Sequence, residues 1–119
     1  MFLEVLLGVD NEFLTVNIPE VFSNYKDLTQ GKRYRFCVAM VVRYMREMDI
    51  DHGWFSSRDV ANHWGLPRPP GNLTLVLQKL VSVRDSQIPF VVEEMQNQYC
   101  SNNGQWVHLF LVRKSGKVE

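Results

Sequence analysis

Metal-binding and nucleophilic residues are few in this sequence and lie far apart. The candidates are the three histidines and the two cysteines: His52, His63, His108, Cys37 and Cys100. None has a second histidine or cysteine at the spacing that zinc sites use. Cys100 and His108 could approach each other across a hairpin, but two ligands do not make a metal site. We therefore expect no metal site.

Catalytic patterns are also missing from the sequence. It contains no glycine-rich phosphate loop and no nucleophile elbow. Glu93 and Glu94 are adjacent, and in a strand they would point to opposite faces. Cys37 lies in an apolar helical pattern, which is typical of a buried core thiol. We expect that the protein is not an enzyme and uses no cofactor.

A different group of polar side chains is suited to contacts with nucleic acid. Arginine and lysine neutralise phosphates, whereas glutamine, asparagine and threonine can hydrogen-bond to base edges or to the backbone. The candidate DNA-binding residues are Arg58, Arg68, Asn72, Thr74, Gln78, Lys79, Asn102 and Asn103. We expect Thr74 and Gln78 to contact bases. The cations and the two asparagines of residues 102–103 would contact phosphates.

Two consecutive helices would position most of these side chains. Residues 56–66 predict a short helix with Ser56 or Ser57 as its N-cap, Asp59 in its first turn and Gly65 at its end. A proline-rich connection at residues 67–71 follows, and Asn72 is a natural N-cap for a second helix over residues 73–83.

The second helix has one apolar face and one mixed face. Helical spacing places Leu73, Val76, Leu77, Leu80 and Val83 together, as expected of core residues. The opposite face carries Thr74, Leu75, Gln78, Lys79 and Ser82. This face has little positive charge for a helix that enters a major groove. A helix that is merely solvated or that meets a protein therefore remains an alternative.

Strands and a longer helix surround this pair. Residues 89–95 and 106–112 predict a hairpin whose tip contains residues 102–105. Residues 32–48 predict a helix that is apolar on two sides, because Phe36 and Met40 lie off its main face. The second cover would be an N-terminal hairpin formed by residues 2–9 and 13–18, or a partner subunit.

The order of these elements resembles the winged helix-turn-helix superfamily. Ala61, Gly65 and Leu66 match the spacing of the helix-turn-helix motif, although the connection at residues 67–71 is about two residues longer than usual. The resemblance covers residues 32–113. It implies an α+β fold with a three-helix core and a C-terminal β-hairpin wing, and a short strand near residues 54–56 that pairs with the wing.

The totals suit one domain. The chain has 119 residues, which we divide into an N-terminal hairpin and linker (1–31), a winged-helix core (32–113) and a polar tail (114–119). Its 13 basic and 13 acidic side chains cancel, which weakens a role in binding nucleic acid without excluding it. We find no signal peptide, no membrane span and no disulfide framework, and expect a cytoplasmic protein.

The resemblance implies binding to double-stranded DNA, as a small transcriptional regulator or a replication accessory. One copy offers so few cations that we expect a homodimer, formed through the N-terminal hairpin or the surface of Phe36 and Met40. The alternative is a protein-interaction module that keeps the winged-helix shape. In that case Leu75, the apolar residue on the outer face of the second helix, would anchor the partner.

Overall fold

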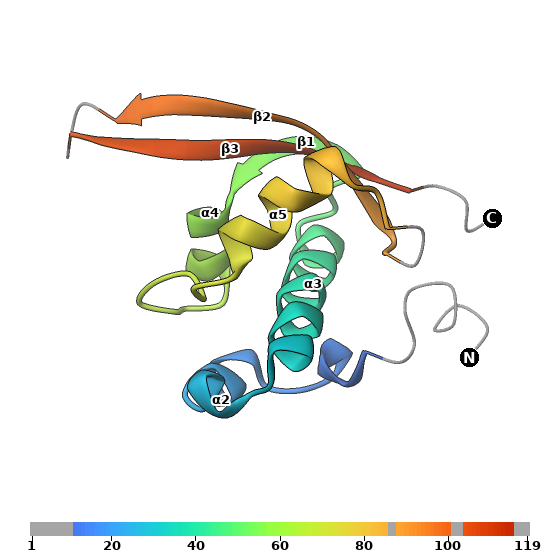
Figure 1. Ribbon diagram of the computed structural model, residues 1–119, viewed down its shortest axis with the longest axis vertical. Helices are drawn as coiled ribbons and strands as arrows, with labels where there is room; N and C mark the ends of the chain where they lie inside the picture. Colours follow the sequence, from blue (N-terminus) through green and yellow to red (C-terminus); the bar gives the residue numbers. More distant parts are fainter. Residues whose placement is uncertain (1–10, 86–87, 101–103, 116–119) are drawn as a thin grey trace.

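Helices and strands occupy separate layers of the structure (Figure 1). The computed structural model describes residues 11–85, 88–100 and 104–115. Within these residues the elements are η1 (Glu12–Leu14), α2 (Ile18–Phe22), η2 (Tyr25–Asp27), α3 (Gln30–Glu47), β1 (His52–Ser56), α4 (Ser57–His63), α5 (Leu73–Ser82), β2 (Phe90–Cys100) and β3 (Gln105–Lys114). This is an α+β fold, as expected.

The strands form an antiparallel sheet in the order β1-β3-β2. β1 pairs with the C-terminal half of β3, from His52 opposite Arg113 to Ser56 opposite Leu109. β2 pairs along the whole of β3 and is interrupted by a bulge between Val92 and Glu94. The short strand expected near residues 54–56 is therefore confirmed. The hairpin is longer than predicted and extends past β1 and the helices (Figure 1).

α3 is the centre of the core. It contributes side chains that are fully or almost fully buried, including Phe36, Cys37, Ala39, Met40 and Val41. Other buried side chains come from the sheet, among them Phe55, Phe110 and Val112, and from α5, among them Leu73 and Leu77. The helix is covered on two sides, as its sequence predicts, and the thiol of Cys37 is buried.

Local hydrogen bonds define both ends of α4. The Ser56 side chain accepts from the backbone N–H of Asp59 at 3.1 Å, and the Asp59 carboxylate accepts from the N–H of Ser56 at 2.9 Å. This reciprocal pair is a capping box. At the other end Gly65 has a φ of 72°, and the N–H of Leu66 donates to the carbonyl of Ala61 at 2.9 Å. The helix thus begins and ends where its sequence predicts.

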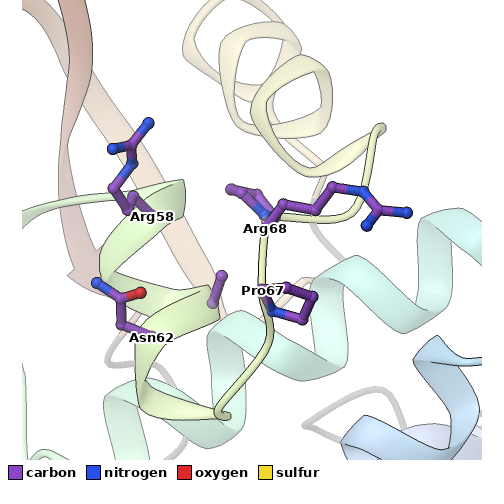
Figure 2. A pocket seen from close by; sticks show the side chains of 6 residues that line it. Arg58, Asn62, Pro67 and Arg68 are labelled. Atoms are coloured by element: carbon purple, nitrogen blue, oxygen red, sulfur yellow. The ribbon is translucent and has the colours of Figure 1, made fainter. Parts of the chain in front are cut away.

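The connection from α4 to α5 runs through Pro67 and Arg68 (Figure 2). Asn72 occupies the N-cap position of α5, but its side chain makes no cap hydrogen bond. Instead its Oδ1 accepts from the Tyr25 hydroxyl at 2.9 Å. The predicted position of Asn72 is confirmed, whereas side-chain capping is wrong. The Asn72 oxygen that would cap α5 is thus bonded to Tyr25 of η2. The N–H of Leu73 donates to the backbone carbonyl of Pro70.

Residues 13–18 are not a strand, so the predicted N-terminal hairpin is wrong in its second half. Its first half, residues 2–9, lies outside the described residues. Asn11 caps η1 by accepting from the N–H of Phe13 at 3.0 Å, and Asn17 caps α2 by accepting from the N–H of Glu20 at 2.9 Å. Pro19 lies in the first turn of α2. These asparagine caps favour helical turns over an extended chain.

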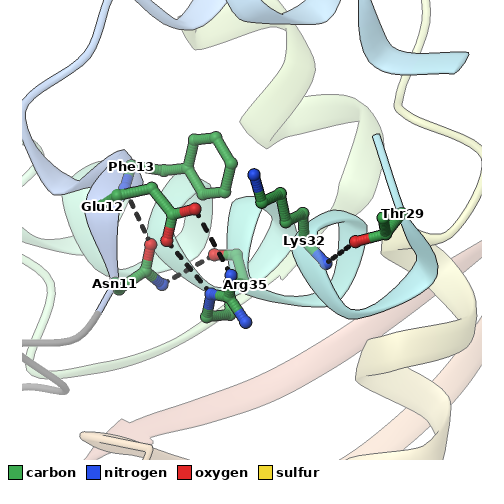
Figure 3. Close-up of polar contacts among 6 residues, drawn as sticks. All are labelled: Asn11, Glu12, Phe13, Thr29, Lys32 and Arg35. Atoms are coloured by element: carbon green, nitrogen blue, oxygen red, sulfur yellow. Dashed lines mark hydrogen bonds and ion pairs between the residues drawn. The ribbon is translucent and has the colours of Figure 1, made fainter. Parts of the chain in front are cut away.

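The capped segment is attached to the start of α3 by polar contacts (Figure 3). The Asn11 side chain donates to the carbonyl of Arg35 at 2.7 Å, and the guanidinium of Arg35 pairs with Glu12 at 3.1 Å. The same asparagine therefore caps η1 and attaches it to α3.

This segment covers the part of α3 that we expected to need a second cover. The centroid of the Phe36 ring lies 5.3 Å from that of Phe13 and 5.8 Å from that of Tyr25. The side chains of Phe36 and Met40 are completely buried. A homodimer through the surface of Phe36 and Met40 is therefore wrong for this structure, because that surface lies inside one chain.

Candidate nucleic-acid interface

α5 presents one stripe of side chains that no described element covers. Its other side packs on α3 and on β2, where Leu73, Leu77 and their neighbours are buried. On the outer side Leu75 is 61% exposed, Lys79 and Ser82 are exposed, and Gln78 is half-buried. At 1.5 Å per residue, the ten residues of α5 present a stripe roughly 15 Å long.

The first turn of α5 is tied to its surroundings. The Thr74 hydroxyl lies 2.6 Å from that of Ser57, so a hydrogen bond joins the start of α5 to the start of α4. Asn72 bonds to Tyr25, as described above. Both side chains of the predicted interface therefore have partners within the chain, and a contact to DNA would have to share or replace those partners.

Arg58 and Arg68 line one cavity of about 250 Å³ with Asn62 and Pro67 (Figure 2). Their guanidinium groups do not converge on it. Figure 2 shows them pointing in different directions, and that of Arg68 lies 5.4 Å from the centre of the Phe22 ring. Arg68 therefore makes a cation–π contact with α2, whereas Arg58 extends from the first turn of α4. Two diverging cations do not make a pocket for a small anion, but they can reach separate phosphates.

Lys79 lies beside a cation that the sequence analysis missed. Lys79 and Arg84 both line an open cavity of about 510 Å³ at the C-terminal end of α5, together with Tyr34 and Asp85. Arg84 was missed because it follows the last predicted helical residue, so helical spacing gave it no face. Its short distance in sequence from Lys79 was the available signal.

Asp85 lines this cavity too, so one carboxylate lies beside the two cations. Its carboxylate accepts from the Tyr34 hydroxyl at 3.2 Å. Burial, followed by the nearby carboxylate, raises the pKa of Tyr34 to about 12, so the hydroxyl keeps its proton and can donate at neutral pH.

Charge is unevenly distributed along the chain, although its total is zero. Residues 57–85 contain four cations, Arg58, Arg68, Lys79 and Arg84, against two carboxylates, Asp59 and Asp85. Both carboxylates accept hydrogen bonds from within the chain. None of Arg58, Lys79 and Arg84 forms an ion pair within the described residues. The helix pair therefore carries an excess of positive charge that its own acids do not cover.

The hairpin has a different character. Between Arg84 and Arg113 the sequence has no lysine or arginine, and Glu93 is paired with Arg113 at 2.6 Å and with His52 at 2.9 Å. These partners, Arg113 first, lower the pKa of Glu93. Asn102 and Asn103, the predicted phosphate contacts at the tip, lie outside the described residues.

Comparisons with other proteins identify no relative. No protein-family model, no curated protein and no solved structure matches this chain. Within residues 11–85, 88–100 and 104–115 no three potential metal ligands cluster, and the helices found there are too short or too polar to cross a lipid bilayer.

Proposed function

We propose that this protein binds double-stranded DNA as a winged-helix protein, with α4 and α5 as its helix-turn-helix. The order α3, β1, α4, α5, β2, β3 and a sheet in which β1 flanks β3 support this assignment. The observation that carries the function is the uncovered stripe of α5 with unpaired cations at both ends. Arg58 lies near its first turn, because Ser57 bonds to Thr74, and Lys79 and Arg84 lie toward its last turn.

The stripe assigns different roles to its residues. Gln78 would hydrogen-bond to base edges in the major groove, and Leu75 would contact a thymine methyl group. Arg58, Lys79 and Arg84 would contact phosphates on either side. Thr74, Asn72 and Arg68 take part in intramolecular contacts, so they would support the geometry of the helix pair more than they would add affinity.

Fluorescence anisotropy with a labelled random duplex at low salt tests this proposal. Lys79→Ala and Arg58→Ala should each weaken binding on the order of tenfold, since one charge-assisted contact contributes about 1.4 kcal/mol. Lys114→Ala is the matched control, because it removes one charge from the end of β3 outside the helix pair. No binding by the wild-type protein at about 50 μM, or equal losses in all three variants, would reject the proposal.

A protein-interaction module is the second candidate, and the exposure of Leu75 favours it. A leucine that is 61% exposed in the middle of the stripe is a suitable anchor for an apolar pocket on a partner. In this case the wild-type protein would not bind the duplex at all. In the DNA-binding case, Leu75→Asp would instead weaken duplex binding, because it places a negative charge against the phosphates.

A further inference from the structure

The projecting part of the hairpin has an apolar surface that the DNA-binding proposal does not use. We call residues 95–99 and 106–108 the distal hairpin. Met95 is 39% exposed, Tyr99 is 53% exposed and Trp106 is 65% exposed. Tyr99 and Trp106 are cross-strand partners, and the centroids of their rings lie 5.2 Å apart. Met95 lies four residues before Tyr99 on β2, so the alternation of side chains places it on the same face of the sheet as Tyr99 and Trp106.

The distal hairpin also has open backbone edges. β1 ends opposite Leu109, so residues 106–108 of β3 have a strand on one side only within the described part of the chain. β2 is the outermost strand of the sheet along its whole length. An open edge leaves N–H and C=O groups that another strand can pair with.

Nothing in the distal hairpin protects these edges. Proteins usually guard an exposed edge with a charged side chain, a proline or a bulge. Residues 95–99 and 106–108 contain no lysine, arginine, aspartate, glutamate or proline, and the bulge lies before them, between Val92 and Glu94. These residues therefore leave the edge available for pairing with another strand.

We propose that the distal hairpin is the surface through which two copies of this chain associate. A second copy is favoured because the surface carries no acidic side chain and no lysine or arginine. Two identical edges without such side chains meet without repulsion, whereas a strongly charged partner would find no complementary charge there. The composition also fits an interface core, in which tyrosine, tryptophan and methionine are enriched and charged residues are depleted.

Twofold symmetry makes the β2 edge complementary to itself. If two β2 strands pair antiparallel about Asn97, Met95 of each copy lies opposite Tyr99 of the other. These side chains share one face of the sheet, so both crossings are apolar contacts. Trp106 lies beside Tyr99 on the same face and enlarges the contact. This dimer needs neither the buried surface of Phe36 and Met40 nor bound DNA.

Sedimentation velocity of the full chain without DNA tests the proposal. At concentrations from about 1 to 100 μM, the range expected for a small interface, the wild-type protein should reach twice the 13.9 kDa mass of one chain. Trp106→Glu and Tyr99→Glu should both remain monomeric over that range, because each would bury a charge in the contact.

Met48→Glu is the control, because Met48 is 51% exposed at the C-cap of α3, outside the distal hairpin. It should dimerise like the wild-type protein. Far-UV circular dichroism of each variant verifies that the fold is retained. A wild-type protein that stays monomeric throughout, or a dimer that survives in both hairpin variants, would overturn the proposal. Either result leaves the DNA-binding measurement intact, since that assay reads a different surface.

Discussion

The thiol of Cys37 is buried, and its burial opposes loss of the proton. The sulfur lies 3.8 Å from the Tyr25 hydroxyl. Burial raises the pKa of Cys37 to about 12, from about 8.5 for a cysteine in an unfolded chain. The folded protein therefore keeps this proton at pH values where the unfolded chain loses it.

The free energy of unfolding should fall as the pH rises above about 8.5. Because the unfolded chain binds fewer protons there, stability decreases by at most about 1.4 kcal/mol per pH unit from this thiol. The tyrosines whose pKa is raised contribute in the same direction only above about pH 10. Urea unfolding of the wild-type protein and of Cys37→Ala between pH 7.5 and 9.5 measures the effect. An equal decline in both proteins would contradict this account.

Gly65 is required for its backbone conformation and not for space. Its φ is 72°, and a Cβ built on it would meet no atom within 4 Å. Gly65→Ala should therefore lower the free energy of unfolding by about 1 kcal/mol, the strain of a left-handed alanine. Gly71→Ala is the matched control, because Gly71 has equal space and no positive φ. Urea unfolding compares them, and equal stability of the two variants would refute the argument.

Arg43 is one of the side chains of α3 that hold the N-terminal segment. One nitrogen of the Arg43 guanidinium donates to the carbonyls of Phe13 and Val16, at 3.1 and 2.7 Å, and the group lies 4.8 Å from the centre of the Trp64 ring. Arg43 therefore connects the turn after η1 to the end of α4, two elements that are distant in sequence.

Arg43→Met should loosen this segment without unfolding the core, because the contacts of Asn11 and Glu12 with Arg35 remain. The variant keeps the apolar part of the side chain and loses two hydrogen bonds to buried or half-buried backbone, which should cost about 2 to 3 kcal/mol. Hydrogen exchange should accelerate in residues 11–18 more than in α5. Arg46→Met, on an exposed position of the same helix, is the control and should exchange like the wild-type protein. Unchanged exchange in Arg43→Met would show that apolar packing alone holds the segment.

The sequence predicts best those elements whose ends are capped by their own neighbours. The capping box at Ser56 and the left-handed Gly65 are local signals, so the limits of α4 could be inferred without a structure. Residues 13–18 contain apolar positions that suit a strand or short helical turns equally. The caps at Asn11 and Asn17 are local signals too and favour the helical turns, but the apolar pattern on its own does not record them. Only the hydrogen bonds from Arg43 come from a distant part of the sequence.

The candidate site is less predictable than the helices that present it. Helical spacing identified the exposed positions of Leu75 and Lys79, but it wrongly placed Val83 in the core. α5 ends at Ser82, so Val83 leaves the helical face and is 54% exposed. Helical spacing could not reveal that Asn72 bonds to Tyr25, 47 residues earlier, or that Thr74 bonds to Ser57. The length of the hairpin was underestimated because residues 96–98 are polar and resemble a loop. Pairing with β3 nevertheless keeps them extended.

At the scale of the whole molecule, the unpaired cations and the exposed aromatic pair lie on different elements. The excess cations lie on α4, α5 and the residues that flank them, whereas the exposed aromatic pair lies on the distal hairpin. A dimer formed through the hairpins would therefore leave both helix pairs available. It would double the number of cations that one DNA duplex can meet, which would compensate for a chain of zero net charge.

The salt dependence of DNA binding measures this doubling. Each phosphate neutralised contributes about −0.9 to the slope of log K against log salt, so Arg58, Lys79 and Arg84 predict about −2.7 per chain and about −5 for a dimer. Anisotropy titrations between about 50 and 200 mM salt should give the steeper slope for the wild-type protein and about half of it for Trp106→Glu. An identical slope in both proteins would mean that only one helix pair of the dimer contacts the duplex. A slope shallower than about −1 would remove these three cations from the interface, because counterion release would then involve no more than one phosphate.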